Sequence, residues 1–309
     1  MGKNEIRLRS SKRFDLQRKV VSHMTSESWK NIPHVSYLYE PDVTGFYEEF
    51  MALAGGKRAS GQSLSFNTIM LRVIVEGLKA APELNAILEY CHRKGEGTVH
   101  VCDSINIAVP WLLPDGRIIT PVLADVQAIT LAELSAAVSV LGEKISNTNI
   151  DEMLYQAVVA DTVTELKKFH LNIFQRILAA KVSFHPLRGL RGKAKKEYYR
   201  EPQEHRLSER NLISATVTVS NIGSLYKEQK GCFGILEIIP PQIFAVGLGA
   251  VQEKPGVYVN KIGEKEIGIR KVLPMCLAFD HRAVDFNTLV PFLKKLDEIF
   301  ANPQIIHTW

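Results

Sequence analysis

Apolar and polar positions follow two alternating periods along the chain, and this alternation predicts an α/β protein. Helical spacing of three and four residues is clearest from Phe66 to Ala81 and from Thr130 to Ile145. Runs rich in β-branched residues predict strands at 215–220, 242–251 and 267–278. The remaining expected elements are helices at 14–29 and at 44–54 before a stop at Gly55-Gly56, strands at 32–39, 98–102, 105–113 and 118–123, and a turn at Lys254-Pro255-Gly256.

The stretch at about 146–210 departs from this pattern. Residues 161–180 carry apolar side chains at helical spacing, whereas no strand signal occurs from 150 to 211. A basic run from Arg188 to Arg200 and further polar residues follow. We therefore expect a helical and basic insertion into an α/β body.

Composition limits the classes to which the protein can belong. Of 309 residues 46% are hydrophobic and 23% charged, so a substantial core can form. No run of about 18 apolar residues is present to span a membrane, and the basic N-terminus lacks the apolar stretch of a secretory signal. The cysteines form no CxxC pair, which predicts free thiols in a cytoplasmic protein. They are Cys91, Cys102, Cys232 and Cys276.

The most informative stretch for chemistry runs from Met275 to Phe292. It begins as a buried strand, breaks at Asp280-His281-Arg282 and Asp285, and continues as a helix that Asn287 could cap. Imidazole titrates near neutral pH, and a neighbouring carboxylate can orient it. These residues alone leave two interpretations open: His281 is a general base, or the segment is an ordinary loop with a surface salt bridge. The helix would bury Leu289, Phe292, Leu293 and Leu296 on one face.

Seven segments in order resemble the catalytic domain of the dihydrolipoyl acyltransferases of 2-oxo acid dehydrogenase complexes. They cover nearly the whole chain outside about 146–210, and together they favour the general-base interpretation of His281. The segments are SWKNIPHV at 28–35, DVT at 42–44, PELNA at 82–86, INIAV at 105–109 with Gly116 and Pro121-Val122, SNIGS at 220–224, PPQ at 240–242 and FDHRAVD at 279–285.

The resemblance implies a fold like that of chloramphenicol acetyltransferase, with a two-layer mixed sheet and helices. We expect one acyltransferase catalytic domain over 1–309, and two departures from the family: the insertion at about 146–210, and no lipoyl or subunit-binding domain. The resemblance also implies a homotrimer or larger homo-oligomer with active sites between subunits. Coenzyme A is then a substrate that meets a dihydrolipoyl thiol carried by a separate protein, and no bound prosthetic group or metal is expected.

Residue roles follow from the same resemblance. His281 would take the proton from the attacking thiol, and the thiolate would attack the thioester carbonyl of the other substrate. Ser220, at the end of its strand, would donate to the oxyanion, with Thr218 as the alternative if the register is shifted by two. The simpler interpretation of Ser220 is a turn-forming Ser-Asn pair.

Asp285 and Phe286 stand at the end of the last matching segment and directly after it. Asp285 matches the family's second motif position and is expected to hold the loop through an ion pair, with Arg18 or Arg13 as candidate partners. Phe286 stands where the family has glycine, and a side chain there could reshape or close the pocket.

The basic run has three interpretations. Residues 188–200 hold six basic residues and one acidic residue, and their net charge of +5 equals the formal charge of the whole chain. Lys193, Lys195 and Lys196 would attract the phosphates of coenzyme A, and Tyr198 would stack on adenine. A solvated loop is the simpler alternative. Nucleic-acid binding has weak support because the rest of the chain is close to neutral.

Three functions are compatible with these residues. The leading one is acyl transfer between coenzyme A and a thiol acceptor such as dihydrolipoyl. A non-catalytic oligomeric scaffold is favoured by Phe286 but opposed by the presence of His281, Asp285 and Ser220 together. A coenzyme A-dependent acyltransferase acting on a small-molecule amine or hydroxyl is favoured if, as expected, no lipoyl domain is present.

Overall fold

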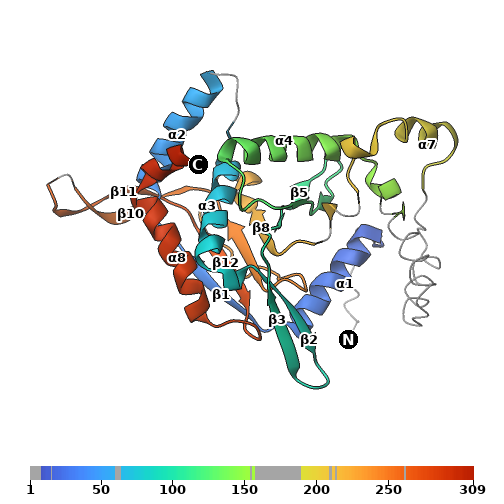
Figure 1. The fold of residues 1–309 in the computed structure, drawn as a ribbon, viewed down its shortest axis with the longest axis horizontal. Coiled ribbons are helices and arrows are strands. Elements are labelled where there is room, and N and C mark those ends of the chain that lie inside the picture. The colour runs from blue at the N-terminus through green and yellow to red at the C-terminus, as the bar shows by residue number, and fades with distance from the viewer. Residues whose placement is uncertain are drawn as a thin grey trace, which may run out of the picture. The chain divides into compact units, whose positions relative to one another are not determined.

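A computed structural model of the chain describes residues 8–14, 16–59, 64–153, 155–156, 189–208, 211–212, 214–260 and 262–309. They fall into two compact units, and Figure 1 traces the chain through them. The first unit comprises Met1–Glu27 and Asn149–Arg200, and the second comprises Ser28–Thr148 and Glu201–Trp309.

Local sequence signals fix several helix ends. Ser65 caps α3 by accepting from the Thr68 amide, and Thr130 and Glu133 form a reciprocal capping box on α4. The helices are α1 (Leu16–Asn31), α2 (Thr44–Ala59), α3 (Phe66–Ala80), α4 (Leu131–Ser146), α7 (Gly192–Tyr198) and α8 (Phe286–Ala301), with 3-10 turns η1 (Pro82–Leu84), η2 (Gln203–His205), η4 (Ile222–Ser224) and η5 (Pro303–Thr308). No helix in the described ranges is long and apolar enough to cross a membrane.

A central mixed sheet organises the second unit, in the strand order β1-β12-β9-β8-β4-β7. β8 runs parallel to β9, whereas β12 runs antiparallel to both β9 and β1. The ribbons β2–β3, β5–β6 and β10–β11 lie outside this sheet. The strands are β1 (His34–Tyr39), β2 (Ala86–Cys91), β3 (Glu96–Val101), β4 (Ile107–Ala108), β5 (Trp111–Leu112), β6 (Ile118–Ile119), β7 (Val122–Leu123), β8 (Val217–Asn221), β9 (Phe244–Leu248), β10 (Gln252–Val259), β11 (Lys265–Val272) and β12 (Met275–Asp280).

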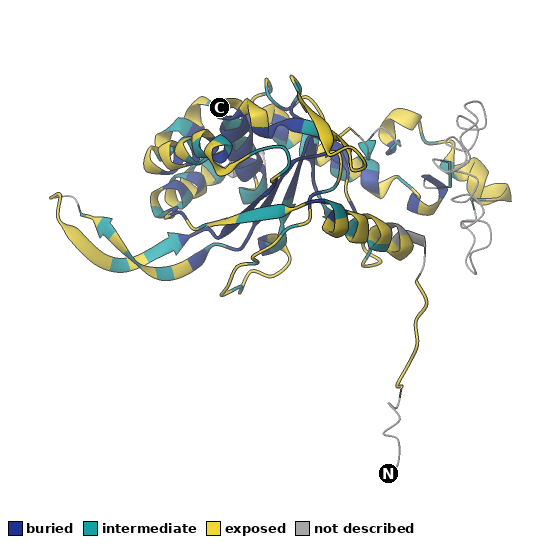
Figure 2. Cartoon of the chain, turned by 90° about the horizontal axis from the view of Figure 1, so that it is seen from below, coloured by how far each residue is buried: buried dark blue, intermediate teal, exposed yellow. Residues whose placement is uncertain are grey.

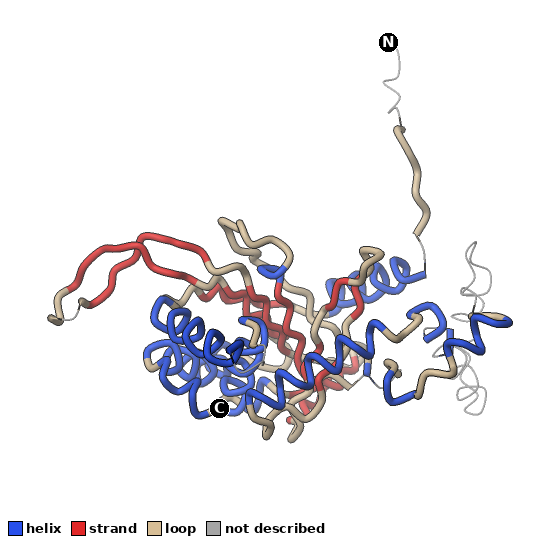
Figure 3. Tube along the Cα trace, turned by 90° about the horizontal axis from the view of Figure 1, so that it is seen from above, coloured by secondary structure: helices blue, strands red, loops and turns tan. Residues whose placement is uncertain are grey.

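The two faces of the central sheet are covered differently. Helices gather on one face (Figures 2 and 3), where the rings of Phe244 and Phe292 lie 5.4 Å apart and fully buried. The other face carries the small residues Ala245, Gly247 and Ala278, and the segment between β8 and β9 packs on it. A Cβ at Gly247 would lie 2.2 Å from a ring carbon of Phe233, so the absence of a side chain there permits this close approach.

The β10–β11 hairpin extends from the central sheet and is exposed along much of its length (Figure 2). Val257 pairs with Ile267 and Pro255 with Ile269, so these side chains share one face of the ribbon. Val257 is 65% exposed, Ile267 79% and Ile269 76%. A contiguous apolar face of this kind is typical of a protein contact surface.

In the first unit, a buried glutamate organises the basic segment. Glu152 accepts hydrogen bonds from the Leu190 amide at 2.5 Å and the Tyr199 hydroxyl at 2.8 Å, and it lies 3.9 Å from Lys195 Nζ. Burial opposes ionisation, but a further hydrogen bond from Gln156 and these partners outweigh it and hold the pKa of Glu152 below its ordinary value.

Two breaks expected from the sequence are wrong. α2 continues through Gly55-Gly56 to Ala59, because glycine lowers helix stability by only about 1 kcal/mol and need not end a helix. Lys254-Pro255-Gly256 lies within β10, where a two-stranded ribbon leaves edge positions that tolerate proline.

Other differences concern strands and a helix cap. β2 was not expected, and the expected strand at 98–102 is its partner β3. The expected strands at 105–113 and 118–123 are each divided near a proline, which cannot donate to a ladder. Asp285, and not Asn287, is the N-cap of α8. The helix expected at 161–180 lies outside the described residues.

Replacing Gly77 by alanine should destabilise the second unit. A Cβ there would lie 2.6 Å from Phe292 Cε2 and 2.8 Å from Leu296 Cδ1, and both residues are fully buried in α8. Overpacking costs about 1–3 kcal/mol, and the helix preference of alanine over glycine offsets roughly 1 kcal/mol of this cost. We expect the free energy of unfolding in a urea titration to fall by up to about 2 kcal/mol. Gly55→Ala is the control, because no atom lies within 4 Å of a Cβ at that position, and it should raise the free energy of unfolding. A higher free energy of unfolding in both variants would contradict the close packing of α3 on α8.

Acid should loosen the first unit. The lowered pKa of Glu152 means that its carboxylate contributes stability above the ordinary value of 4.5, and that this contribution is lost as the pH falls through the folded-state pKa. We expect the backbone amide hydrogens of residues 189–199 to exchange faster as the pH falls below 4.5, after correction for the intrinsic exchange rates. In Glu152→Gln the same amide hydrogens should exchange faster at neutral pH, and their exchange rates should change little as the pH is lowered. A variant that keeps the full wild-type pH dependence would exclude Glu152 as the cause.

Candidate active site

His281 lies in the turn between β12 and α8. Its backbone amide donates to the Pro33 carbonyl at 3.1 Å, which ties the turn to the start of β1. Its side chain is 49% exposed, and Nδ1 lies 3.2 Å from Asp285 Oδ1. A carboxylate beside Nδ1 favours a proton on that nitrogen and a lone pair on Nε2. No residue in the described ranges binds Nε2, so it is available to accept a proton.

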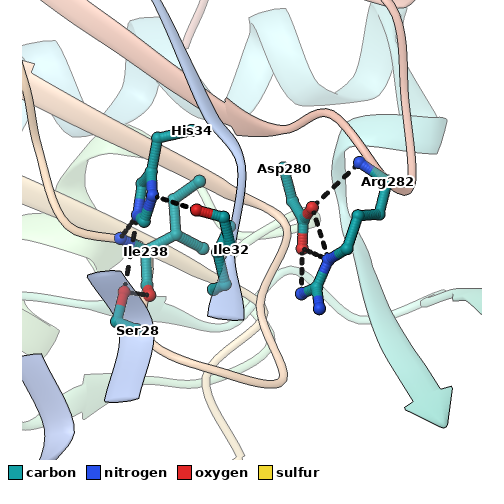
Figure 4. A network of polar contacts seen from close by, with 6 residues as sticks. All are labelled: Ser28, Ile32, His34, Ile238, Asp280 and Arg282. Atoms are coloured by element: carbon teal, nitrogen blue, oxygen red, sulfur yellow. Dashed lines mark hydrogen bonds and ion pairs between the residues drawn. The ribbon is translucent and has the colours of Figure 1, made fainter. Parts of the chain in front are cut away.

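The residues on either side of His281 form a buried ion pair (Figure 4). Asp280 is 1% exposed, and its Oδ2 lies 2.6 Å from Arg282 Nη2. Its Oδ1 accepts from both Nε and the backbone amide of Arg282 at 3.0 Å. Because an unpaired buried carboxylate is costly, this bidentate pair fixes the turn that presents His281.

A second polar network binds the segment before β9 to the start of β1 (Figure 4). His34 Nδ1 donates to the Ile32 carbonyl at 2.8 Å, and its Nε2 accepts from the Ile238 amide at 3.1 Å. Ser28 Oγ donates to the Ile238 carbonyl at 2.6 Å. This arrangement uses the neutral form of His34, and it stiffens the backbone beside Pro33, whose carbonyl holds His281.

Ser220 is the fourth residue of β8 and is half-buried, and its hydroxyl has no hydrogen-bond partner within the described part of the chain. Asn221 makes the turn, since its side chain accepts from the Ser224 amide at 3.0 Å. Thr218 is buried, and its hydroxyl donates to Gln242 at 2.7 Å. Of the two hydroxyls considered from the sequence, that of Ser220 is therefore the available donor.

Strand register places Ser220 and His281 at opposite ends of the central sheet. Ser220 pairs with Gly247, which pairs with Cys276, and His281 follows Cys276 by five residues. At about 3.3 Å per residue and roughly 4.8 Å between strands, their Cα atoms lie about 19 Å apart. One chain therefore cannot bring both side chains to the same reacting carbon.

Phe286 is the first residue of α8 and is 45% exposed. Its ring packs edge-on against Tyr37 of β1, with centroids 5.2 Å apart. Tyr37 pairs with Leu277, which precedes His281 by about 13 Å of strand. This contact directs the ring toward Tyr37 in β1, and an effect of Phe286 on the pocket stays a prediction.

The basic residues singled out from the sequence lie on or beside α7 in the first unit. Lys193 Nζ lies 3.7 Å from Glu197, and Lys195 lies beside Glu152 and 5.7 Å from the ring centroid of Tyr199. Tyr198 packs edge-on against Tyr199, with centroids 5.1 Å apart. The roles of Lys193, Lys195, Lys196 and Tyr198 toward coenzyme A stay predictions, as does an ion pair of Asp285 with Arg18 or Arg13.

Sequence reasoning missed the supporting roles of His34 and Arg282. One signal was present: an aspartate that ends a wholly apolar strand requires a cationic partner, and Arg282 stands two residues away. The bond of His34 to Ile238 joins segments 204 residues apart and leaves no local pattern.

The chain is similar to acyltransferase components of two complexes. It is 22% identical over 269 residues to the dihydrolipoyllysine-residue acetyltransferase component of pyruvate dehydrogenase complex from Mycobacterium bovis, covering 87% of this chain and 37% of that protein. It is 25% identical over 245 residues to the dihydrolipoyllysine-residue succinyltransferase component of 2-oxoglutarate dehydrogenase complex from Haemophilus influenzae, covering 78% and 41%. The chain spans about two-fifths of the length of these relatives.

Solved structures share the fold. Azotobacter vinelandii dihydrolipoamide acetyltransferase matches with a TM-score of 0.63 at 19% identity, over 99% of this chain and 95% of that chain. The cubic core of the pyruvate dehydrogenase multienzyme complex matches with the same score at 18% identity and the same coverage. These similarities confirm the expected α/β fold with a mixed sheet and helices.

The family described as 2-oxoacid dehydrogenases acyltransferase (catalytic domain) matches residues 9–179 and 192–308. These ranges include Ser220, His281 and Asp285 and make up well over half of the chain. The chain therefore belongs to the 2-oxoacid dehydrogenases acyltransferase family, whose catalytic domain it contains.

Proposed function

We propose that the protein is a coenzyme A-dependent acyltransferase that moves an acyl group between coenzyme A and a thiol acceptor such as dihydrolipoyl. One observation carries the proposal: His281 has a carboxylate 3.2 Å from Nδ1 and a free Nε2 within the described residues. Family membership supplies the reaction class. The relatives act on dihydrolipoyllysine residues by name, which supports this acceptor.

The reaction needs a base and a way to stabilise the charge that the base acquires. His281 Nε2 takes the proton from the dihydrolipoyl thiol, and the thiolate attacks the thioester carbonyl carbon of the acyl-coenzyme A. As the tetrahedral intermediate collapses, the carbon–sulfur bond to coenzyme A breaks and His281 returns the proton to that sulfur. Asp285 stabilises the imidazolium between the two transfers.

The oxyanion of that intermediate needs a hydrogen-bond donor, and we assign this role to Ser220 of a second copy. The register separates Ser220 from His281 within one chain, so the donor must come from elsewhere. Its hydroxyl is half-buried and unpartnered by the described residues, which suits a donor held for a developing charge.

A homo-oligomer follows from this assignment, and we propose the homotrimer expected from the sequence. The apolar face of the β10–β11 hairpin supports it, because Ile267 and Ile269 remain more than 70% exposed in a single chain. The hairpin starts just after β9, whose end lies beside the end of β8 that carries Ser220. A second copy whose His281 reaches Ser220 would therefore lie next to the hairpin.

The basic residues of α7 and a separate lipoyl carrier would bring the two substrates to the site. We propose that Lys196 attracts the phosphates of coenzyme A, whereas Lys193 and Lys195 lie 3.7 Å and 3.9 Å from the carboxylates of Glu197 and Glu152. The dihydrolipoyl acceptor would be carried by a separate lipoylated protein. A cytoplasmic location stays a prediction.

Replacing His281 by alanine should abolish most of the proposed activity. General-base catalysis contributes about 10²–10⁴-fold, so we expect kcat for transfer from acetyl-coenzyme A to dihydrolipoamide to fall by about that factor. The thermal midpoint should stay unchanged, since the side chain is half exposed. His100→Ala, another half-exposed histidine that lies 3.7 Å from a carboxylate, is the matched control and should retain full turnover. Wild-type turnover in His281→Ala would remove the base from the mechanism.

Replacing Ser220 by alanine should lower kcat with little effect on KM. An oxyanion donor acts in the transition state, and losing one costs about 10²–10³-fold in kcat. Steady-state kinetics with both substrates varied measures the split. Thr218→Val serves as the control: it leaves the Gln242 amide oxygen without its buried partner, so it should lower stability more than turnover in the folded fraction. A larger loss of kcat in folded Thr218→Val than in Ser220→Ala would reverse the assignment.

A further inference from the structure

Two contacts hold the Arg282 guanidinium at once. It forms the bidentate pair with Asp280, and its Cζ lies 4.6 Å from the ring centroid of Tyr90. A cation within about 6 Å over an aromatic ring is attracted by the ring's electrons. The Arg282 side chain is only 16% exposed, so the two contacts leave it little freedom.

Tyr90 comes from a distant part of the chain but is itself anchored. It lies on β2, where Leu88, two residues earlier, donates its amide to the Pro241 carbonyl at 2.8 Å. That segment leads directly into β9, a central strand of the sheet. The root of the β2–β3 hairpin is therefore fixed to the sheet, and the Tyr90 ring is presented at a defined place beside the His281 turn.

We propose that Tyr90 is a positioning residue for the acyl transfer described above: its ring holds Arg282 against Asp280 and so fixes the orientation of His281. This inference rests on the proposed function, since it concerns the same base. His281 stands between the two paired residues in sequence, and its amide is tied to Pro33. The Asp280–Arg282 pair thus holds the residues on either side of His281 in sequence, and the Pro33 carbonyl holds the backbone amide of His281 itself.

The chemistry of the contact predicts which substitutions matter. The attraction needs an aromatic face, so phenylalanine should replace tyrosine and leucine should not. Losing the ring would let Arg282 adopt other rotamers and would admit water to Asp280. A small displacement of a catalytic group reduces the rate far more than it reduces substrate affinity. The effect should therefore appear in kcat and not in KM.

The first test is the kinetics of Tyr90→Leu and Tyr90→Phe in the full chain, with dihydrolipoamide and acetyl-coenzyme A. We expect Tyr90→Leu to lower kcat by about 3- to 30-fold, the factor that such a contact is worth, with KM within about twofold. Tyr90→Phe should restore at least half of the wild-type kcat. Glu89→Leu, the same new residue one position away on the opposite face of β2, should have wild-type kinetics.

The second test asks whether Tyr90 acts through Arg282. Lysine keeps the charge at position 282 but cannot form the planar bidentate pair that faces the ring. In an Arg282→Lys background, Tyr90→Leu should have no further effect on kcat beyond about twofold. A full loss in that background would show that Tyr90 acts by another route, and equal kcat in Tyr90→Leu and wild type would remove its role altogether.

A third readout does not depend on turnover. In protein labelled with 15N-arginine, the Arg282 Nε–Hε resonance should be shifted by the Tyr90 ring current in wild type and Tyr90→Phe, and should lose that shift in Tyr90→Leu. If wild type shows the shift but no acyl transfer, the proposed function fails while the contact stands. If all three proteins give the same Arg282 resonance, the positioning proposal fails whatever the activity.

Discussion

Strand register is the constraint on which the site depends. β12 runs antiparallel to β9, and β9 runs parallel to β8, so the turn after β12 and the end of β8 lie at opposite ends of the sheet. The proposed base and the proposed oxyanion donor are each well placed locally, yet they are separated by about 19 Å in one chain. A second copy reconciles the two observations, and the exposed apolar hairpin that starts near Ser220 gives that copy a surface to contact.

The turn that carries His281 is rigid because polar contacts fix the residues next to it. Asp280 would be costly to bury alone, and Arg282 makes the burial tolerable through a bidentate pair. The Pro33 carbonyl fixes the backbone of His281, and the His34 network fixes the backbone next to Pro33. The base is therefore exposed to substrate while its support is buried, an arrangement that lowers the cost of orienting it during reaction.

Sequence patterns predicted the parts of the fold with strong periodicity. The helix at 66–81, the capped helix after Thr130 and the strand ending at Asp280 are all present, because their apolar spacing and caps act locally. Patterns failed where tertiary context decides: Gly55-Gly56 sits inside α2, and Pro255 sits inside an edge ribbon. The His281–Asp285 pair was visible as an i, i+4 spacing, whereas the contact of Arg282 with Tyr90 was not, because it joins segments nearly two hundred residues apart.

Mixing two inactive variants tests most directly whether the site is built from two copies. Ser220→Ala and His281→Ala chains would be co-expressed in equal amounts and assayed for acyl transfer beside each variant alone. In a closed ring of randomly mixed subunits, about one quarter of the interfaces would combine an intact His281 with an intact Ser220, so turnover should recover to about a quarter of the wild-type value. Turnover that stays at the level of the single variants would contradict a shared site and return both residues to one chain.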